Sequence, residues 1–126
     1  MIAVDTSSLI AYLSDQTGSD VDLVELSLQQ KNAVFPPVVV TELLSDPKLP
    51  ESVVQLFLTI PMLEPGQGFW IRAGKLRTSV LAKRRKARLA DCLIAQTCLD
   101  HDVALVTRDR DFRNFALVSE LKVLGV

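Results

Sequence analysis

Short apolar segments alternate with stretches of helical spacing along the whole of this 126-residue chain, and this alternation constrains its fold more than any other feature. The apolar segments predict short strands at residues 2–4, 33–35, 62–63, 103–107 and 122–126. The helical spacing predicts helices at residues 6–13, 20–30, 37–44, 50–59, 69–86, 89–100 and 111–115. Strands separated by helices pair in parallel, with helices covering the sheet. The sequence therefore predicts one α/β domain, residues 1–126, with a mostly parallel central sheet flanked by helices on both faces.

Acidic residues stand at several ends of the predicted elements. Asp5 ends the first strand, Asp109 follows a later strand, and Asp91 lies in the first turn of a helix. In an open parallel sheet, the carboxyl ends of the strands and the starts of the following helices lie at the same edge. Glu42 is about five residues into its helix, roughly 8 Å along it at about 1.5 Å per residue. Four carboxylates are therefore expected to converge at this edge.

Such a convergence of acids needs a counter-charge. Two carboxylates ~4 Å apart repel each other by about 4 kcal/mol at an effective dielectric constant of about 20. No lysine or histidine in the segments that carry these acids is placed to neutralise them, and His101 is expected at an exposed helix end. Oxygen ligands without histidine or cysteine favour Mg²⁺ or Mn²⁺ over Zn²⁺. The sequence predicts a divalent-cation site, although a helix cap or a surface charge also explains Asp91 or Asp109 taken singly.

The charges of the chain are strongly segregated. Residues 72–88 include eight basic and no acidic side chains, whereas the rest of the chain has six basic side chains against fifteen acidic ones. The formal net charge of −1 hides this division. A basic segment beside an acidic remainder predicts a polyanionic partner, and a solvated helix face is the alternative explanation.

The four acids lie in four short motifs: Asp5-Thr-Ser after the first strand, TELL around Glu42, LADCLIA around Asp91, and TRDRDF around Asp109. In this order and at this spacing, the motifs resemble those of PIN-domain ribonucleases, specifically the VapC-type toxins of toxin–antitoxin systems. The resemblance implies that Asp5, Glu42, Asp91 and Asp109 are catalytic and bind Mg²⁺ or Mn²⁺. It also implies an endoribonuclease, which hydrolyses RNA phosphodiester bonds with the help of the metal.

The same resemblance assigns supporting roles to other residues. Thr6, Ser7 and Thr107 are expected to hold the carboxylates or water beside the metal. Asp111 directly precedes a helical turn, so its position predicts an N-cap or first-turn residue, with a second or outer-sphere ligand of the metal as the alternative. Seven basic residues are expected to bind the RNA backbone: Arg72, Lys75, Lys83, Arg84, Arg85, Lys86 and Arg88. The expected protein partners are a cognate VapB-like antitoxin and a second copy of the chain in a homodimer.

Other classes of protein fit the sequence less well. The apolar runs are far shorter than the roughly 20 residues of a membrane span, and the charge at Asp5 is unlike a signal peptide, so a cytoplasmic protein with no membrane partner is expected. A phosphotransferase of the haloacid-dehalogenase type needs a second aspartate where Ser7 stands. A non-catalytic PIN-like interaction module, acting through antitoxin and operator DNA binding, remains the alternative. Phe69 and Trp70 are expected to anchor a helix in the core, with a contact to a second copy or to an antitoxin as the alternative.

Overall fold

The computed structural model describes residues 1–126 and has the α/β fold that the sequence predicts. Its strands are short and lie close to the predicted positions: β1 (Ile2–Val4), β2 (Ala33–Val34), β3 (Ala104–Val106) and β4 (Val123–Leu124). Its helices are α1 (Thr6–Leu13), α2 (Ser19–Gln29), α3 (Pro37–Leu44), α4 (Glu51–Leu58), α5 (Phe69–Ala82), α6 (Leu89–His101), the 3₁₀ helix η1 (Arg110–Phe112) and α7 (Arg113–Ala116). None of these helices has the length and apolar character that crossing a membrane requires.

The four strands form one parallel sheet in the order β2-β1-β3-β4. β1 is an inner strand, and its Ile2 is in register with Ala33 of β2 and with Ala104 of β3. The strand predicted at residues 62–63 is reduced to a single bridge between Phe35 and Met62. The chain moves from β1 to β2 in one direction across the sheet and then through β3 to β4 in the other. Because such connections are right-handed, this reversal places helices on both faces.

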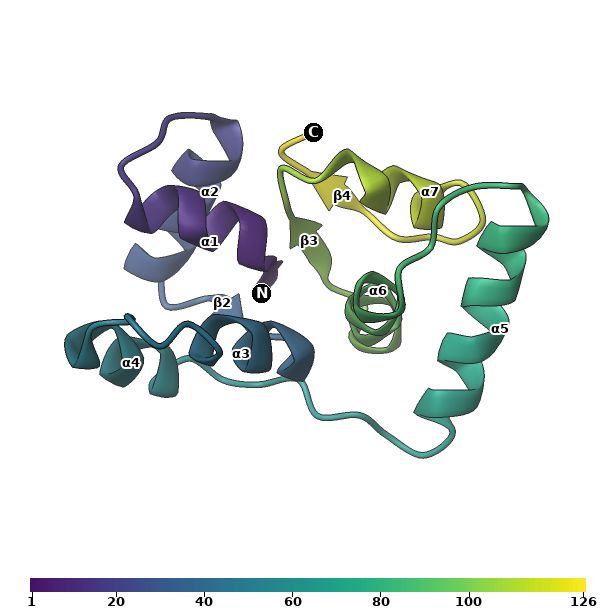
Figure 1. Cartoon of the computed structure of the whole chain (residues 1–126), viewed down its shortest axis with the longest axis horizontal. Helices are drawn as coiled ribbons and strands as arrows, with labels where there is room; N and C mark the ends of the chain where they lie inside the picture. The colour runs from purple at the N-terminus through teal and green to yellow at the C-terminus, as the bar shows by residue number, and fades with distance from the viewer.

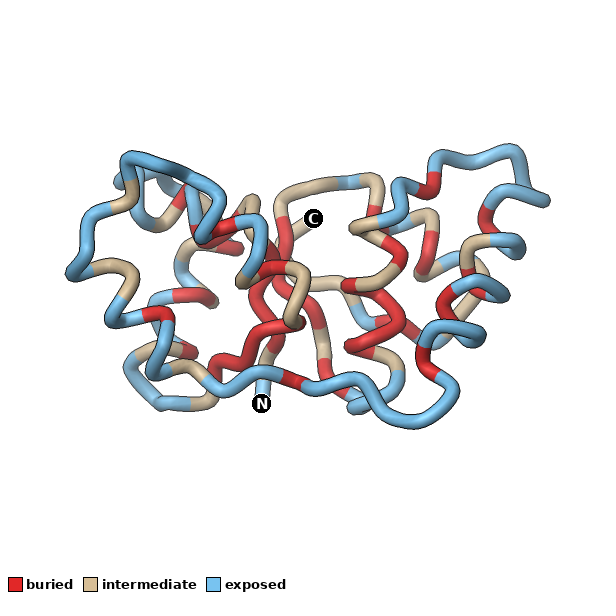
Figure 2. Tube along the Cα trace, turned by 60° about the horizontal axis from the view of Figure 1, so that its bottom comes forward, coloured by how far each residue is buried: buried red, intermediate tan, exposed pale blue.

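The helices cover the sheet from both sides, with α1 and α2 to the left of β3 and with α6 and α5 to its right in Figure 1. α2 packs against β2 and β3, and α1 packs on α2. α6 packs against β3, and α5 packs on the outer side of α6. Buried segments gather in the middle of the molecule, while the two ends of its long axis are mostly exposed (Figure 2). The core therefore surrounds β1 and β3, whose buried residues include Val4 and Leu105.

Helix α5 ends four residues earlier than predicted. Its last core residue is Val80, which is fully buried, whereas residues 81–86 are all exposed. Arg84 takes the left-handed conformation at φ 57°, and the N–H of Arg85 donates to the carbonyl oxygen of Val80 at 3.4 Å. This arrangement is a Schellman motif, which satisfies the last carbonyls of a helix where its apolar periodicity stops. Residues 83–88 therefore form a loop to α6 instead of extending α5.

The prediction that both aromatic residues at the start of α5 lie in the core is wrong for one of them. Phe69 is buried, but Trp70 is 67% exposed. The two rings meet edge to face, with their centroids 4.9 Å apart. Neighbouring residues of an α-helix point in directions about 100° apart, so a helix that covers the core with one face buries only one of such a pair.

Candidate metal centre

The carboxyl ends of β1 and β3 lie side by side at one edge of the sheet, as the strand order requires. Asp5 directly follows β1, and its N–H donates to the carbonyl oxygen of Val106 in β3 at 2.9 Å. Asp5 occupies the N-cap position of α1, but its side chain makes no capping hydrogen bond. The carboxylate of Asp5 is therefore available for other contacts at this edge.

Two hydroxyls hold the buried carboxylate of Asp5. Ser7 Oγ and Thr107 Oγ1 each donate to Asp5 Oδ2 at 2.7 Å, and Asp5 is only 4% exposed. Burial and the nearby charge of Asp109 raise the pKa of Asp5, and the two hydrogen bonds oppose this rise. Thr107 Oγ1 also accepts the N–H of Asp109 at 3.0 Å. One threonine hydroxyl therefore ties together the acids that follow β1 and β3.

Glu42 approaches the same edge from α3. Thr6 Oγ1, in the first turn of α1, donates to Glu42 Oε1 at 2.9 Å, and Glu42 is exposed. Packing of α3 against α1 and α6 sets the position of Glu42. All three hydroxyl residues that were predicted to support the site thus contact one of these acids, and their part in catalysis stays a prediction.

Asp91, Asp109 and Asp111 form a close group of acids. One carboxylate oxygen of each lies within 4.8 Å of the corresponding oxygens of the other two. Asp91 projects from the first turn of α6, Asp109 follows β3, and Asp111 lies in η1. Asp91 Oδ2 is buried and has no hydrogen-bond partner. Burial and the negative charges of Asp109 and Asp5 raise the pKa of Asp91 to about 6.

Asp109 caps the helical turn, because Asp109 Oδ1 accepts the N–H of Asp111 at 2.9 Å. Of the two positions predicted for Asp111, N-cap or first turn, the structure has the first turn. Asp111 Oδ2 lies 3.2 Å from the ammonium nitrogen of Lys86. This contact does not contradict the expectation that no lysine in the segments carrying the four predicted acids neutralises them, because Asp111 is not one of the four. Lys86 belongs to a different sequence segment, and only the fold brings it beside η1.

The acid group fits a hard divalent cation. Its possible donors are all carboxylate oxygens, and one buried oxygen among them has no partner within the chain. Mg²⁺ and Mn²⁺ accept such ligands together with water. Asp91, Asp109 and Asp111 could hold the ion directly. Asp5 and Glu42 are near enough for their charges to raise the pKa of Asp91, so they lie at the margin of the same site.

The sequence analysis did not predict an ion pair that forms directly beside Asp109. Arg108 lies between Thr107 and Asp109, and its guanidinium donates to both carboxylate oxygens of Asp20 at 2.8 and 3.0 Å. Asp20 is 3% exposed and also accepts a hydrogen bond from Ser8 Oγ. The hydrogen bonds from Arg108 lower the pKa of Asp20. The pair fixes the backbone after β3 to the start of α2. In the sequence, Asp20 by itself indicates only the start of a helix, so it gives no sign of this contact.

The basic residues predicted to bind RNA are in different surroundings. Arg72 forms an ion pair with Asp100 at 2.6 Å, and Lys86 pairs with Asp111. The other five are exposed: Lys75, Lys83, Arg84, Arg85 and Arg88. The charge of Arg88 acts on Asp91 and opposes the rise of its pKa. The loop at residues 83–88 thus places positive charge beside the acid group, and the binding of RNA there stays a prediction.

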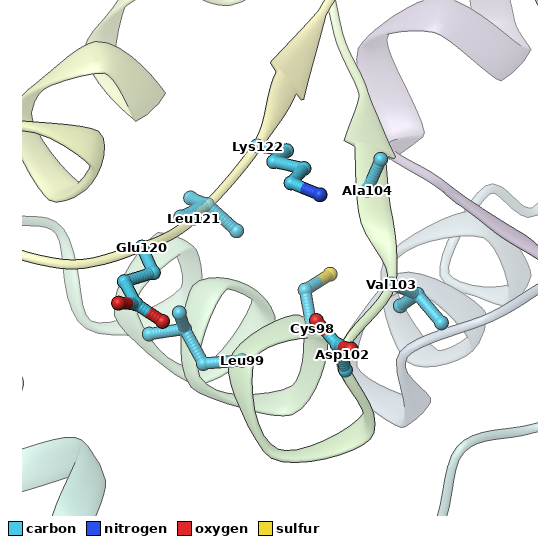
Figure 3. Close-up of a pocket in the computed structure, with 8 residues that line it drawn as sticks. All are labelled: Cys98, Leu99, Asp102, Val103, Ala104, Glu120, Leu121 and Lys122. Carbon is cyan, nitrogen blue, oxygen red and sulfur yellow. The ribbon is translucent and has the colours of Figure 1, made fainter.

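A separate cavity lies at the opposite edge of the sheet, near the start of β3 (Figure 3). Its volume is about 190 Å³, and Cys98 of α6 and Lys122 beside β4 point into it. Burial raises the pKa of Cys98 to about 12, so the thiol is protonated at neutral pH. Cys98 and Cys92 are both buried and form no disulfide. Because none of the acids of the candidate metal centre lines this cavity, it is not part of that site.

A family model for the PIN domain matches residues 2–118 of the sequence. Because this match spans nearly the whole chain, the protein belongs to the PIN domain family. A comparison with curated proteins gives no significant match.

Several solved structures share the fold along almost the full length of the chain. VapBC2 from Rickettsia felis, bound to a DNA fragment from its promoter, is similar with a TM-score of 0.75 and 22% identity, over 98% of this chain and 97% of that one. FitAcB from Neisseria gonorrhoeae is similar with a TM-score of 0.74 and 21% identity, over 99% and 97% of the two chains. VapBC-1 from nontypeable Haemophilus influenzae has a TM-score of 0.72 and 18% identity, over 99% and 98%. At these identities, the similarity shows that the fold is the same.

Proposed function

We propose that this chain is a VapC-type endoribonuclease that hydrolyses RNA phosphodiester bonds with the help of Mg²⁺ or Mn²⁺. The observation that carries the proposal is the buried oxygen of Asp91, which has no partner and lies beside Asp109 and Asp111 in a PIN domain. PIN domains are in general nucleases. A buried carboxylate is costly to the fold unless it is paired or binds a cation. The arrangement of these acids therefore favours a metal-dependent catalytic site over a structural role.

The four acids predicted from the sequence remain the proposed catalytic set, with Asp111 added to it. Asp91, Asp109 and Asp111 bind the ion through their carboxylate oxygens. Asp5 and Glu42 orient the attacking water, and either of them accepts its proton. A divalent ion bound here lowers the pKa of water and offsets negative charge on the phosphate.

The hydroxyl residues keep two of these acids in place before RNA binds. Ser7 and Thr107 hold Asp5 from two sides, and Thr6 holds Glu42. Side chains that are already fixed lose less entropy when the reactive arrangement forms, which lowers the activation free energy. These three hydroxyls are proposed as positioning groups and take no proton from the water.

The exposed loop at residues 83–88 is the proposed entry path for the RNA backbone. Its basic side chains lie next to acids that would otherwise repel phosphate. Arginine and lysine bind nucleic acid backbones by releasing condensed counterions, so this part of the affinity depends on salt. The pairing of Arg72 with Asp100 makes Arg72 a weaker candidate for RNA contact than the residues of the loop.

The proposed partners are a VapB-like antitoxin and a second copy of the chain, and the proposed compartment is the cytoplasm. VapBC assemblies from two organisms share the fold of this chain, which supports an antitoxin partner. Trp70 and Ile71 on α5 are 67% and 68% exposed. Large exposed apolar side chains of this kind are typical of protein interfaces.

The test is a cleavage assay with the purified chain and end-labelled single-stranded RNA. We expect cleavage with Mg²⁺ or Mn²⁺, none in EDTA, and none by the Asp5→Asn variant, which loses a catalytic carboxylate but keeps its shape. Asp15→Asn is the matched control, because Asp15 is exposed and its positive φ suits asparagine. Undiminished cleavage in EDTA would overturn the metal-dependent mechanism.

A non-catalytic interaction module is the second candidate function. It is favoured by two similar structures that contain DNA: VapBC2, described above, and FitAB bound to an IR36 DNA fragment, which is 21% identical over 98% of this chain. A chain that cleaves no RNA under any metal condition, but joins an antitoxin on operator DNA, would support this candidate instead.

A further inference from the structure

We infer that Lys86 is an internal counter-ion of the acid group and that a divalent cation must displace its ammonium group from Asp111 in order to bind. The inference rests on the proposed function, because it concerns the way in which the proposed metal site is filled. It assigns Lys86 a role at the metal centre, in addition to the contact with RNA that its basic neighbours are expected to make.

Lys86 is the basic residue that touches the acid group directly. Its ammonium nitrogen lies 3.2 Å from Asp111 Oδ2, and Asp111 lies within 4.8 Å of Asp91 and Asp109. Arg88 affects the pKa of Asp91 through its charge, but it forms no ion pair with any acid of the group. Lys83, its neighbour in the loop, has an exposed side chain without an ion pair or hydrogen bond.

The backbone around Lys86 is fixed, although its side chain is half exposed. Asn114 Nδ2 of α7 donates to the carbonyl oxygen of Lys86 at 3.0 Å, and Arg77 Nε of α5 donates to that of Ala87 at 2.9 Å. The side chain of Lys86 is 52% exposed. The lysine can therefore leave Asp111 by rotating its side chain, without any movement of the loop.

A divalent ion and the ammonium group compete for the same carboxylate. Asp111 Oδ2 is the oxygen that Lys86 contacts, and Asp111 offers one ligand atom to the possible metal group. A metal ion carries twice the charge of the ammonium group and also binds the other acids, so it replaces Lys86 once its concentration is high enough. The ion pair thus lowers the apparent affinity for metal, since part of the binding free energy goes into breaking it.

The experiment measures Mn²⁺ binding by isothermal titration calorimetry without RNA, in the wild type and three variants. Lys86→Gln removes the competing charge, and we expect it to bind Mn²⁺ about two- to fivefold more tightly, a factor that corresponds to an ion pair of about 0.4–1 kcal/mol. Lys83→Gln removes a charge from the same loop without touching the acids, and we expect a smaller change. Lys86→Arg keeps the charge and should bind Mn²⁺ as the wild type does.

The possible results separate this inference from the proposed function. If the wild type binds Mn²⁺ but Lys86→Gln and Lys83→Gln have equal effects, the exchange is overturned and the proposed nuclease site stands. If Lys86→Gln binds Mn²⁺ more weakly than the wild type, Lys86 supports the ion and the exchange is likewise overturned. If the wild type binds no Mn²⁺, the proposed metal site fails and the inference fails with it. Only tighter binding specific to Lys86→Gln supports the exchange.

Discussion

The two halves of the acidic edge hold their carboxylates in different ways. In the hydroxyl-held half, Asp5 and Glu42 accept hydrogen bonds from serine and threonine side chains at 2.7 to 2.9 Å. In the open half, which consists of Asp91, Asp109 and Asp111, one buried oxygen has no partner and the pKa of Asp91 is raised to about 6. The chain itself thus supplies hydrogen-bond partners for both acids of the first half, but leaves one buried oxygen of the second half without a partner.

This difference has an energetic basis. A hydrogen bond to a charged group contributes about 1.5–3 kcal/mol to stability, whereas a buried polar group without a partner costs about 1–3 kcal/mol. The hydroxyls therefore offset part of the cost of burying Asp5, whereas the buried oxygen of Asp91 has no such compensation within the chain. Substitutions in the open half should therefore lower activity with little loss of stability. Loss of a buried hydroxyl in the hydroxyl-held half should mainly lower stability.

The largest effect is expected from Asp91→Asn in the open half. We expect cleavage to fall by at least about a hundredfold, the scale on which the loss of one charge-stabilising group acts. The free energy of unfolding in EDTA should stay the same or increase, because the substitution removes a repelled and unpartnered charge. Cleavage rates with Mn²⁺ and urea unfolding in EDTA measure the two effects.

Asp102→Asn is the control for this prediction. Asp102 is exposed at the opposite end of α6, and its left-handed conformation suits asparagine. We expect this variant to keep full activity. A marked loss of stability in Asp91→Asn, with Asp102→Asn unchanged, would mean that Asp91 is already satisfied within the chain.

The second effect concerns stability and comes from Thr107→Val in the hydroxyl-held half. Valine keeps the shape of threonine but loses the donor to Asp5 and the acceptor of the Asp109 N–H. We expect a loss of about 2 kcal/mol in the free energy of unfolding, measured by urea in EDTA. Thr78→Val is matched to it, because the Thr78 hydroxyl bonds only to its own helix. Equal losses in the two variants would contradict the proposed importance of the hydroxyl on Asp5.

The third effect is a pH dependence of stability that Asp91 in the open half should show. The folded chain holds the proton of Asp91 with a pKa of about 6, above the ordinary value of 3.8, because of burial and the charges of Asp109, Asp5 and Glu42, which Arg88 opposes only in part. The penalty for ionising Asp91 therefore accumulates as the pH rises from about 4 to 6. In EDTA, the wild type should gain stability relative to Asp91→Asn as the pH falls through this window. A stability difference that does not change with pH would rule this out.

The smallest effect is expected from Thr6→Val. Its hydroxyl bonds to Glu42, which is exposed, so water replaces the lost hydrogen bond. We expect the free energy of unfolding to change by less than about 0.5 kcal/mol. Any loss of cleavage in this variant then reports on the orientation of Glu42. A large loss of stability would show that Thr6 supports the fold as well as the site.

The parts of the molecule that follow from local patterns were predictable from the sequence. The strands and helices follow from apolar periodicity, and the right-handed connections between parallel strands place Asp5 and Asp109 at one edge. The helix that carries Asp91 leads directly into β3, so it ends where that strand starts and begins at the same edge as the acids. For these acids, the positions in the sequence were therefore enough to predict that they lie at the same edge of the sheet.

The rest depends on contacts between segments that no local pattern encodes. The pairs Lys86 with Asp111 and Arg108 with Asp20 join residues from different elements, 25 and 88 positions apart. The early end of α5 depends on the left-handed conformation of Arg84, which non-glycine residues adopt only occasionally. These features determine where the basic loop lies relative to the acids, and no local sequence pattern predicts them.

The inner position of β1 in the sheet determines when the site forms during protein synthesis. The Thr107 hydroxyl that holds Asp5 comes from a residue 102 positions later in the chain, beyond β3, the strand that pairs with β1. A ribosome adds about 5–20 residues per second, so Asp5 waits roughly 5–20 s for this partner. Asp109 and Asp111 are made later still. The acid group is therefore incomplete until the chain has been made as far as Asp111.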